Sequence, residues 1–129
     1  MTVSQFSDME MEFLERVHKM VWCNMATQDS RRRIRSRVMH PIWEGPTCWI
    51  GTRRHSLKAK HLAQSSYVSL AYIADVAKPI YADCTAEWAD GVQEKEHVWE
   101  LFRSAPAPLG FDYGTVFGSP SDSEFGVLS

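Results

Sequence analysis

Five short runs of strand-forming residues, separated by turn signals, constrain the fold of this chain most strongly. They are rich in β-branched and aromatic residues and cover residues 21–27, 34–42, 47–52, 67–73 and 80–88. Only two or three helical segments accompany them, without the regular strand–helix alternation of a doubly wound parallel sheet. The pattern predicts a mainly β, α+β fold in which an antiparallel sheet curls into a small barrel with two to three flanking helices.

Three sequence signals predict where the helices begin. Ser7 and Glu10 have the spacing of a capping box, which predicts a first helix with Ser7 as its N-cap, running to about residue 20. Ser56 is expected to cap a short helix that ends near residue 64. Asp90 is expected to cap a third helix that carries Val98 and its apolar neighbours.

A length of 129 residues predicts a single domain, with an N-terminal helix within residues 1–20 and an irregular tail over residues 105–129, which is rich in Gly, Pro and Ser. No apolar run reaches roughly 18 residues, and the start of the chain lacks the features of a secretory signal, so we expect a cytoplasmic protein and no membrane span. The three cysteines lack metal-type spacing, which favours free thiols and no metal site.

Positive charge is concentrated in one part of the chain. Residues 31–60 hold nine of the fourteen Lys and Arg residues and one of the sixteen acidic residues, so this segment carries +8 and the rest of the chain −10. In a strand, Arg33, Arg35 and Arg37 would share one face and repel one another unless an anion or a carboxylate lies opposite. This segregation predicts an anion-binding region.

The residues around the second predicted helix favour a phosphate site. The strand over residues 47–52 ends in Thr52, and Ser56 and Lys58 follow at the start of the helix, whose backbone N–H groups attract anions. The basic strand over residues 35–38 is expected to pair with residues 48–51 as a hairpin, which would place Arg37 beside Thr52. The guanidinium fork suits a phosphate dianion, so we expect a phosphorylated cofactor here.

From about residue 21 to residue 99, the chain resembles the pyridoxamine 5′-phosphate oxidase-like family, the split barrels that bind flavin mononucleotide (FMN), in particular its general stress protein branch. The resemblance rests on Arg35-Ser36-Arg37-Val38-Met39-His40-Pro41-Ile42-Trp43, on Trp49-Ile50-Gly51-Thr52 with Ser56-Leu57-Lys58, on Val68-Ser69-Leu70-Ala71-Tyr72 and on Ala86-Glu87-Trp88. It implies an antiparallel split β-barrel homodimer with flavin at the subunit interface. It also implies that Arg37, Thr52, Ser56 and Lys58 hold the flavin phosphate and ribityl chain, while the backbone near Val38, Met39 and Gly51 lies along the flavin ring.

The resemblance predicts a flavin-dependent oxidoreductase whose substrate and catalytic residues the sequence does not identify. The vitamin oxidase itself carries Ser-Arg-Lys where this chain has Ser56-Leu57-Lys58, so a role in vitamin processing is not expected. Two alternatives remain open. The barrel could bind a deazaflavin or haem, with His40, His55 or His61 as the axial ligand of the iron. It could instead be a non-catalytic module that binds anions or nucleic acid, which the acidic remainder of the chain disfavours.

Overall fold

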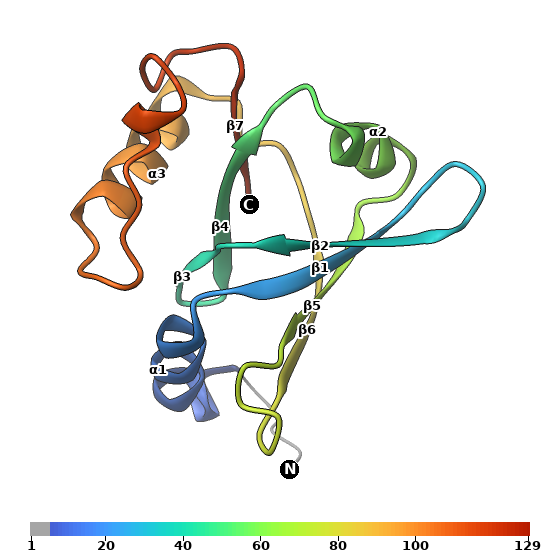
Figure 1. Ribbon diagram of the computed structural model, residues 1–129, viewed down its shortest axis with the longest axis vertical. Coiled ribbons are helices and arrows are strands. Elements are labelled where there is room, and N and C mark those ends of the chain that lie inside the picture. Colours follow the sequence, from blue (N-terminus) through green and yellow to red (C-terminus); the bar gives the residue numbers. More distant parts are fainter. Residues whose placement is uncertain (1–5) are drawn as a thin grey trace.

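Two antiparallel sheets form the framework of this computed structural model, which describes residues 6–129 (Figure 1). The larger sheet has the strand order β2-β1-β5-β6 and contains β1 (Cys23–Gln28), β2 (Ile34–Met39), β5 (Tyr67–Tyr72) and β6 (Ile80–Thr85). The smaller sheet has the order β3-β4-β7 and contains β3 (Ile42–Glu44), β4 (Thr47–Arg53) and β7 (Phe125–Leu128). The predicted mainly β, α+β fold class is confirmed.

Three α-helices lie beside the sheets in the described part of the chain: α1 (Glu10–Met20), α2 (Leu57–Gln64) and α3 (Val92–Ser104). The predicted N-cap of α2 at Ser56 is confirmed. The other two predicted N-caps are wrong. Ser7 lies within a 3-10 turn, so Met9 precedes α1, and Gly91 precedes α3. The Asp90 carboxylate accepts hydrogen bonds from the Arg54 guanidinium at 3.0 and 3.2 Å instead of capping the helix.

The predicted strand over residues 34–42 is two strands, because the chain leaves one sheet and enters the other at Pro41. Proline has no backbone N–H to donate and restricts the residue before it, so a continuous ladder breaks there. The predicted hairpin between residues 35–38 and 48–51 is therefore wrong: β2 pairs with β1, and β4 pairs with β3 and β7. A tight turn favours the β1–β2 pairing, since Asp29 Oδ1 accepts the backbone N–H groups of Arg31 and Arg33 at 2.8 and 2.9 Å.

The sequence predicted an irregular tail over residues 105–129, but part of this segment has regular structure. It contains a 3-10 turn (Tyr113–Thr115) and ends in β7, whose four residues are all buried and pair with β4. Gly126 is required in β7, because a Cβ there would lie 2.6 Å from Trp88 Cζ3 and 2.9 Å from Arg54 Cα. Long-range pairing thus makes a strand from a segment whose local composition favours turns.

Helices α1 and α3 each bury one side against the sheets. Phe13 and Val17, one turn apart in α1, are buried, and the Phe13 ring packs edge-on against Trp43 with a centroid distance of 4.8 Å. Val98 and Phe102, one turn apart in α3, are completely buried. The two helices therefore extend the hydrophobic core from the sheets to opposite parts of the molecule (Figure 1).

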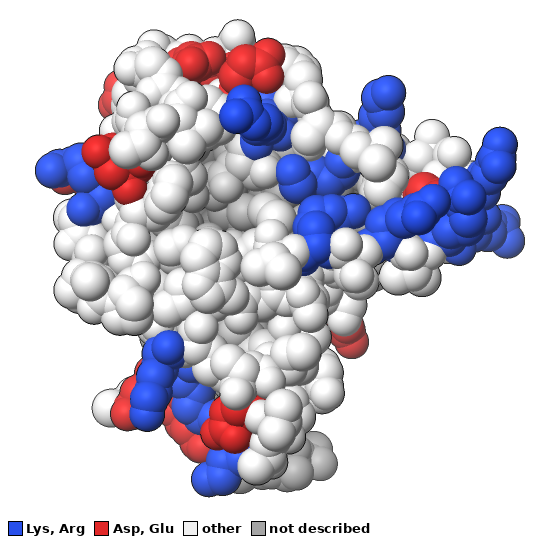
Figure 2. All heavy atoms as spheres, viewed as in Figure 1, with Lys and Arg blue, Asp and Glu red and all other residues white. Residues whose placement is uncertain are grey.

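The turn end of the β1–β2 hairpin projects beyond the rest of the larger sheet, and the hairpin carries much of the positive charge. Lys and Arg side chains gather along it and continue to the rim of a hollow on the face drawn in Figure 2. Asp29 pairs with two of these cations, with its Oδ2 atom 2.8 Å from Arg33 Nε and 3.6 Å from Arg35 Nε. The sequence predicted that the arginines of this strand need an opposite charge nearby. Asp29 supplies that charge for Arg33 and Arg35.

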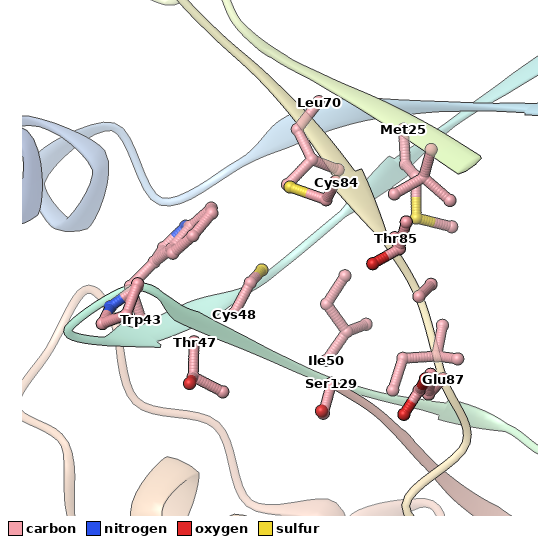
Figure 3. A pocket seen from close by; sticks show the side chains of 14 residues that line it. Met25, Trp43, Thr47, Cys48, Ile50, Leu70, Cys84, Thr85, Glu87 and Ser129 are labelled. Atoms are coloured by element: carbon pink, nitrogen blue, oxygen red, sulfur yellow. The ribbon is translucent and has the colours of Figure 1, made fainter. Parts of the chain in front are cut away.

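A mainly apolar cavity of about 300 Å³ lies inside the barrel, lined by strands of both sheets (Figure 3). Cys48 and Cys84 lie in its wall with Met25 and Leu70, and Cys23 is buried in the same core. All three cysteines are free thiols, as predicted. Burial raises the pKa of Cys23 to about 12 and also raises the pKa of Cys48 and of Cys84. These thiols are therefore protonated at neutral pH and are poor nucleophiles.

Because the raised pKa of Cys23 favours the neutral thiol, we expect it to react slowly with iodoacetamide at pH 8. Its thiolate fraction is roughly a thousandfold below that of an ordinary cysteine. Mass spectrometry of the labelled protein follows Cys23 directly, and the same protein in urea is the control in which all three cysteines react. Labelling of native Cys23 as fast as free cysteine would contradict this description of the core.

A buried hydrogen bond joins the two sheets. The indole N–H of Trp43, in β3, donates to the hydroxyl of Tyr72, in β5, at 3.1 Å, and both side chains are buried. Buried polar groups are costly when they lose their partners. This bond therefore holds the larger and smaller sheets in one arrangement.

The substitution Tyr72→Phe is expected to lower the free energy of unfolding by about 1–3 kcal/mol, because the indole N–H of Trp43 would be left unpaired. Urea denaturation followed by circular dichroism measures the change. Tyr67→Phe is the matched control, since Tyr67 lies in the same strand but is 74% exposed, and it should leave stability unchanged. Equal stability of the two variants would show that the Trp43–Tyr72 bond contributes little.

Candidate functional site

A cavity of about 430 Å³ lies where β2 and β4 end, between these strands, the start of α2 and the C-terminal segment. Its lining contains six of the seven predicted cofactor-binding residues: Arg37, Val38, Met39, Gly51, Thr52 and Lys58. Trp22, His40, Arg53, Phe111 and Tyr113 complete the wall. The structure thus brings together residues that the sequence separates into two strands, a helix and a tail.

Lys58 connects the end of β4 to the start of α2. Its Nζ donates to Thr52 Oγ1 at 2.8 Å and to Ser56 Oγ at 3.3 Å. Ser56 does not line the cavity and its hydroxyl forms no hydrogen bond to the helix backbone, although its backbone is extended as in an N-cap. Ser56, the seventh predicted cofactor-binding residue, is therefore linked to the cavity only through its hydrogen bond with Lys58.

Arg37 is half-buried in β2 and reaches the same cavity with most of its hydrogen-bonding capacity unused. A guanidinium group has five N–H donors, and two of those of Arg37 are used within the described residues. Nη1 donates to the Met25 carbonyl at 3.5 Å, and Nη2 donates to His61 Nδ1 at 3.3 Å. Because arginine only donates, His61 Nδ1 is an acceptor, and it also lies 2.9 Å from Thr27 Oγ1. Buried His61 thus orients the guanidinium and leaves its remaining donors for a ligand.

Positive charge at the cavity is not balanced by the described part of the protein. None of the described carboxylates forms an ion pair with Arg37, Arg53 or Lys58. Burial lowers the pKa of Lys58, and the nearby charges of Arg37 and Arg53 lower it further. Burial also lowers the pKa of Arg37. An anion held between these groups would relieve their repulsion, so the site favours a phosphate or another dianion.

Aromatic residues form the other side of the cavity. Tyr113 packs directly against Gly51 and accepts a hydrogen bond from its backbone N–H. A Cβ at position 51 would overlap the Tyr113 ring, so β4 needs a glycine here. Phe111 lies beside Tyr113 with a ring-centroid distance of 5.1 Å, and Trp22, also in the lining, is 57% exposed. The cavity therefore combines a cationic end with a wall suited to a planar group.

Sequence reasoning missed Phe111 and Tyr113 because both lie in the segment that was predicted to be irregular. A signal was present in the sequence: the tail carries the aromatic residues Phe111, Tyr113 and Phe117 within seven positions. Such spacing indicates a segment that packs on a core. Val38 is 62% exposed and Met39 is buried, so of these two predicted ring contacts only Val38 offers its side chain freely to solvent.

Of the three histidines that the sequence offered as axial ligands, only His40 lines the cavity. It lies between Trp22 and Phe102, and its Nε2 atom is buried and has no hydrogen-bond partner among the described residues. Burial lowers the pKa of His40, which keeps the ring neutral. His55 is exposed and lies outside the cavity lining, and His61 uses Nδ1 for Arg37.

Within residues 6–129, no group of three or more His, Cys, Asp or Glu side chains is arranged to hold a metal ion. None of the helices in this part of the chain is long and apolar enough to cross a membrane. The Thr52 hydroxyl in the cavity lining is hydrogen-bonded to Lys58 at 2.8 Å. The arrangement is suited to hold and orient an anionic ligand.

No family model matches the sequence, and no curated protein matches it. Solved structures do match. A NimC/NimA family protein from Clostridium acetobutylicum is 18% identical, with a TM-score of 0.73, covering 92% of this chain and 79% of that protein. A putative pyridoxamine 5′-phosphate oxidase from Listeria innocua is 14% identical, with a TM-score of 0.70, covering 93% and 90%. At these identities the likeness concerns the fold.

A third structure, a C. acetobutylicum protein related to general stress protein 26 and described as of the pyridoxinephosphate oxidase family, is 16% identical, with a TM-score of 0.69 and coverage of 94% and 81%. Proteins of the same fold also include the haem storage protein HutZ from Vibrio cholerae and an F420 reductase. The fold that the sequence resemblance implied is thus confirmed: this chain has the split-barrel fold of the pyridoxamine 5′-phosphate oxidase-like proteins.

Proposed function

We propose that this protein binds FMN in the cavity between β2, β4 and α2 and acts as a flavin-dependent oxidoreductase. One observation carries the proposal. Arg37, Arg53 and Lys58 converge without a described carboxylate partner at one end of a cavity whose other wall is aromatic. A phosphate joined to a planar ring system has the same two-part character.

Different residues of the cavity hold the phosphate and the ring of the cofactor. Arg37 offers a guanidinium fork to two phosphate oxygens, and Lys58 adds a charge that Thr52 already positions at 2.8 Å. Backbone near Gly51 and the exposed Val38 side chain border the part of the cavity left for the ring. When bound, the flavin supplies the electron-transfer chemistry, while these residues fix its position and limit access of water.

We also propose that two copies of the chain form the working unit, with flavin at their interface. Trp22 and Val38 support this, because both are large apolar residues at the cavity wall and are 57% and 62% exposed. A second copy would cover this surface and close the cavity from solvent. The free thiols fit a reducing compartment, so we place the dimer in the cytoplasm.

Deazaflavin and haem are the alternatives, since the similar structures include an F420 reductase and haem proteins. A deazaflavin cofactor also carries phosphate and would use the same cations. Haem requires an iron ligand, and among the three candidate histidines only His40 lies in the cavity lining, where its buried Nε2 has no hydrogen-bond partner among the described residues. The visible absorption spectrum of the purified protein distinguishes the three: flavin bands support the proposal, and deazaflavin or haem bands overturn it.

Replacing both main cations tests the phosphate site. The variant Arg37→Gln with Lys58→Met is expected to bind FMN at least about a hundredfold more weakly, since each charge-assisted hydrogen bond contributes about 1.5–3 kcal/mol. Quenching of flavin fluorescence measures the affinity, and circular dichroism confirms that the variant is folded.

The matched control replaces one arginine and one lysine outside the cavity, so that the net charge changes by the same amount. Arg31→Gln with Lys19→Met changes exposed side chains outside the cavity lining and should leave FMN affinity unchanged. A folded Arg37/Lys58 variant that keeps wild-type affinity would rule out this cavity as the phosphate site. If the control variant lost FMN affinity equally, the loss would be explained by the change in net charge alone.

A further inference from the structure

A second groove begins on the far side of Arg37. It has a volume of about 900 Å³ and runs between β2 and α2, and both elements contribute to its lining. Arg37 lines both the flavin cavity and the groove, so the two adjoin at the side chain that is expected to hold the phosphate. A group attached to that phosphate would therefore lie next to the groove.

The groove has a surplus of positive charge. Four cations line it, Arg33, Arg35, Arg37 and Lys60, against the single carboxylate of Asp29, which leaves a net charge of +3. Asp29 is fully engaged: Oδ1 accepts two backbone N–H groups, and Oδ2 lies 2.8 Å from Arg33 Nε and 3.6 Å from Arg35 Nε.

These hydrogen bonds lower the pKa of Asp29 to about 2. The carboxylate binds Arg33 closely but only approaches Nε of Arg35, so the terminal nitrogens of Arg35 and the ammonium group of Lys60 remain for a ligand. Figure 2 shows the resulting row of basic side chains along the β1–β2 hairpin.

The opposite wall has a different chemistry. Besides Lys60 and His61, helix α2 contributes Leu57, which is 65% exposed, together with Ala63 and the amide side chain of Gln64. Leu57, Ala63 and Gln64 offer an apolar surface with one amide group, which suits a ribose and a purine base, whereas Lys60 and the arginines suit phosphate. A volume of about 900 Å³ is ample for such a group.

We infer that the protein binds flavin adenine dinucleotide (FAD) in preference to FMN, with the FMN half in the first cavity and the adenylate half in the groove between β2 and α2. This inference rests on the proposed flavin site. The second phosphate of FAD lies against Arg35 and Lys60, and the adenosine extends along α2. Arg37, between the two cavities, serves both phosphates.

Calorimetric titration of the cofactor-free protein with FAD and with FMN tests the inference. We expect wild-type protein to bind FAD at least about tenfold more tightly than FMN, since one additional charge-assisted contact is worth that much. In Arg35→Gln with Lys60→Met, the preference for FAD should disappear while the FMN affinity stays at the wild-type value. Arg31→Gln, a neighbouring exposed arginine outside the groove lining, should keep both affinities.

Two outcomes overturn the inference and leave the FMN site in place: equal affinities of wild-type protein for the two flavins, or equal weakening of both flavins in the Arg35/Lys60 variant. Adenosine diphosphate is added to FMN-loaded protein as a further arm. Its binding together with no preference for FAD would assign the groove to a separate nucleotide and overturn the dinucleotide assignment. Failure of wild-type protein to bind either flavin would instead refute the proposed function.

Discussion

The position of β4 between β3 and β7 is the constraint on which the rest of the structure depends. Its C-terminal end carries Gly51 and Thr52, and pairing with β7 on one side fixes both residues, opposite Val127 and Gly126. On the other side, β3 follows β2 after the break at Pro41, which places the end of β2 beside the end of β4. The phosphate-binding residues therefore meet because of backbone pairing between segments far apart in sequence.

The site departs from the usual pairing of charges in folded proteins. Elsewhere in the described part of the chain, several arginines pair with carboxylates, as Arg33 does with Asp29 and Arg54 with Asp90. At the cavity, Arg37 and Lys58 are half-buried and repel one another, which costs stability in the absence of a ligand. Such a cost is typical of binding sites. A bound anion removes the repulsion between the cations, and this relief contributes to its affinity.

Local signals predicted much of the fold and part of the site. The α2 boundary at Ser56 and the strand at Tyr67–Tyr72 follow from capping and β-propensity, and the charge pattern with the family resemblance led to Arg37, Thr52 and Lys58. The sequence did not predict which strands pair, because the Pro41 break sends one predicted strand into two sheets. It also missed β7 and Tyr113, since their structure comes from long-range contacts rather than from their own composition.

The central claim is that the cations around Thr52 hold the phosphate of a flavin. The most direct measurement compares the affinities of FMN and riboflavin for the wild-type protein, because the two ligands differ by that phosphate alone. We predict that riboflavin binds at least about a hundredfold more weakly, as expected for the loss of two charge-assisted hydrogen bonds. Equal affinity of the two ligands would contradict the account.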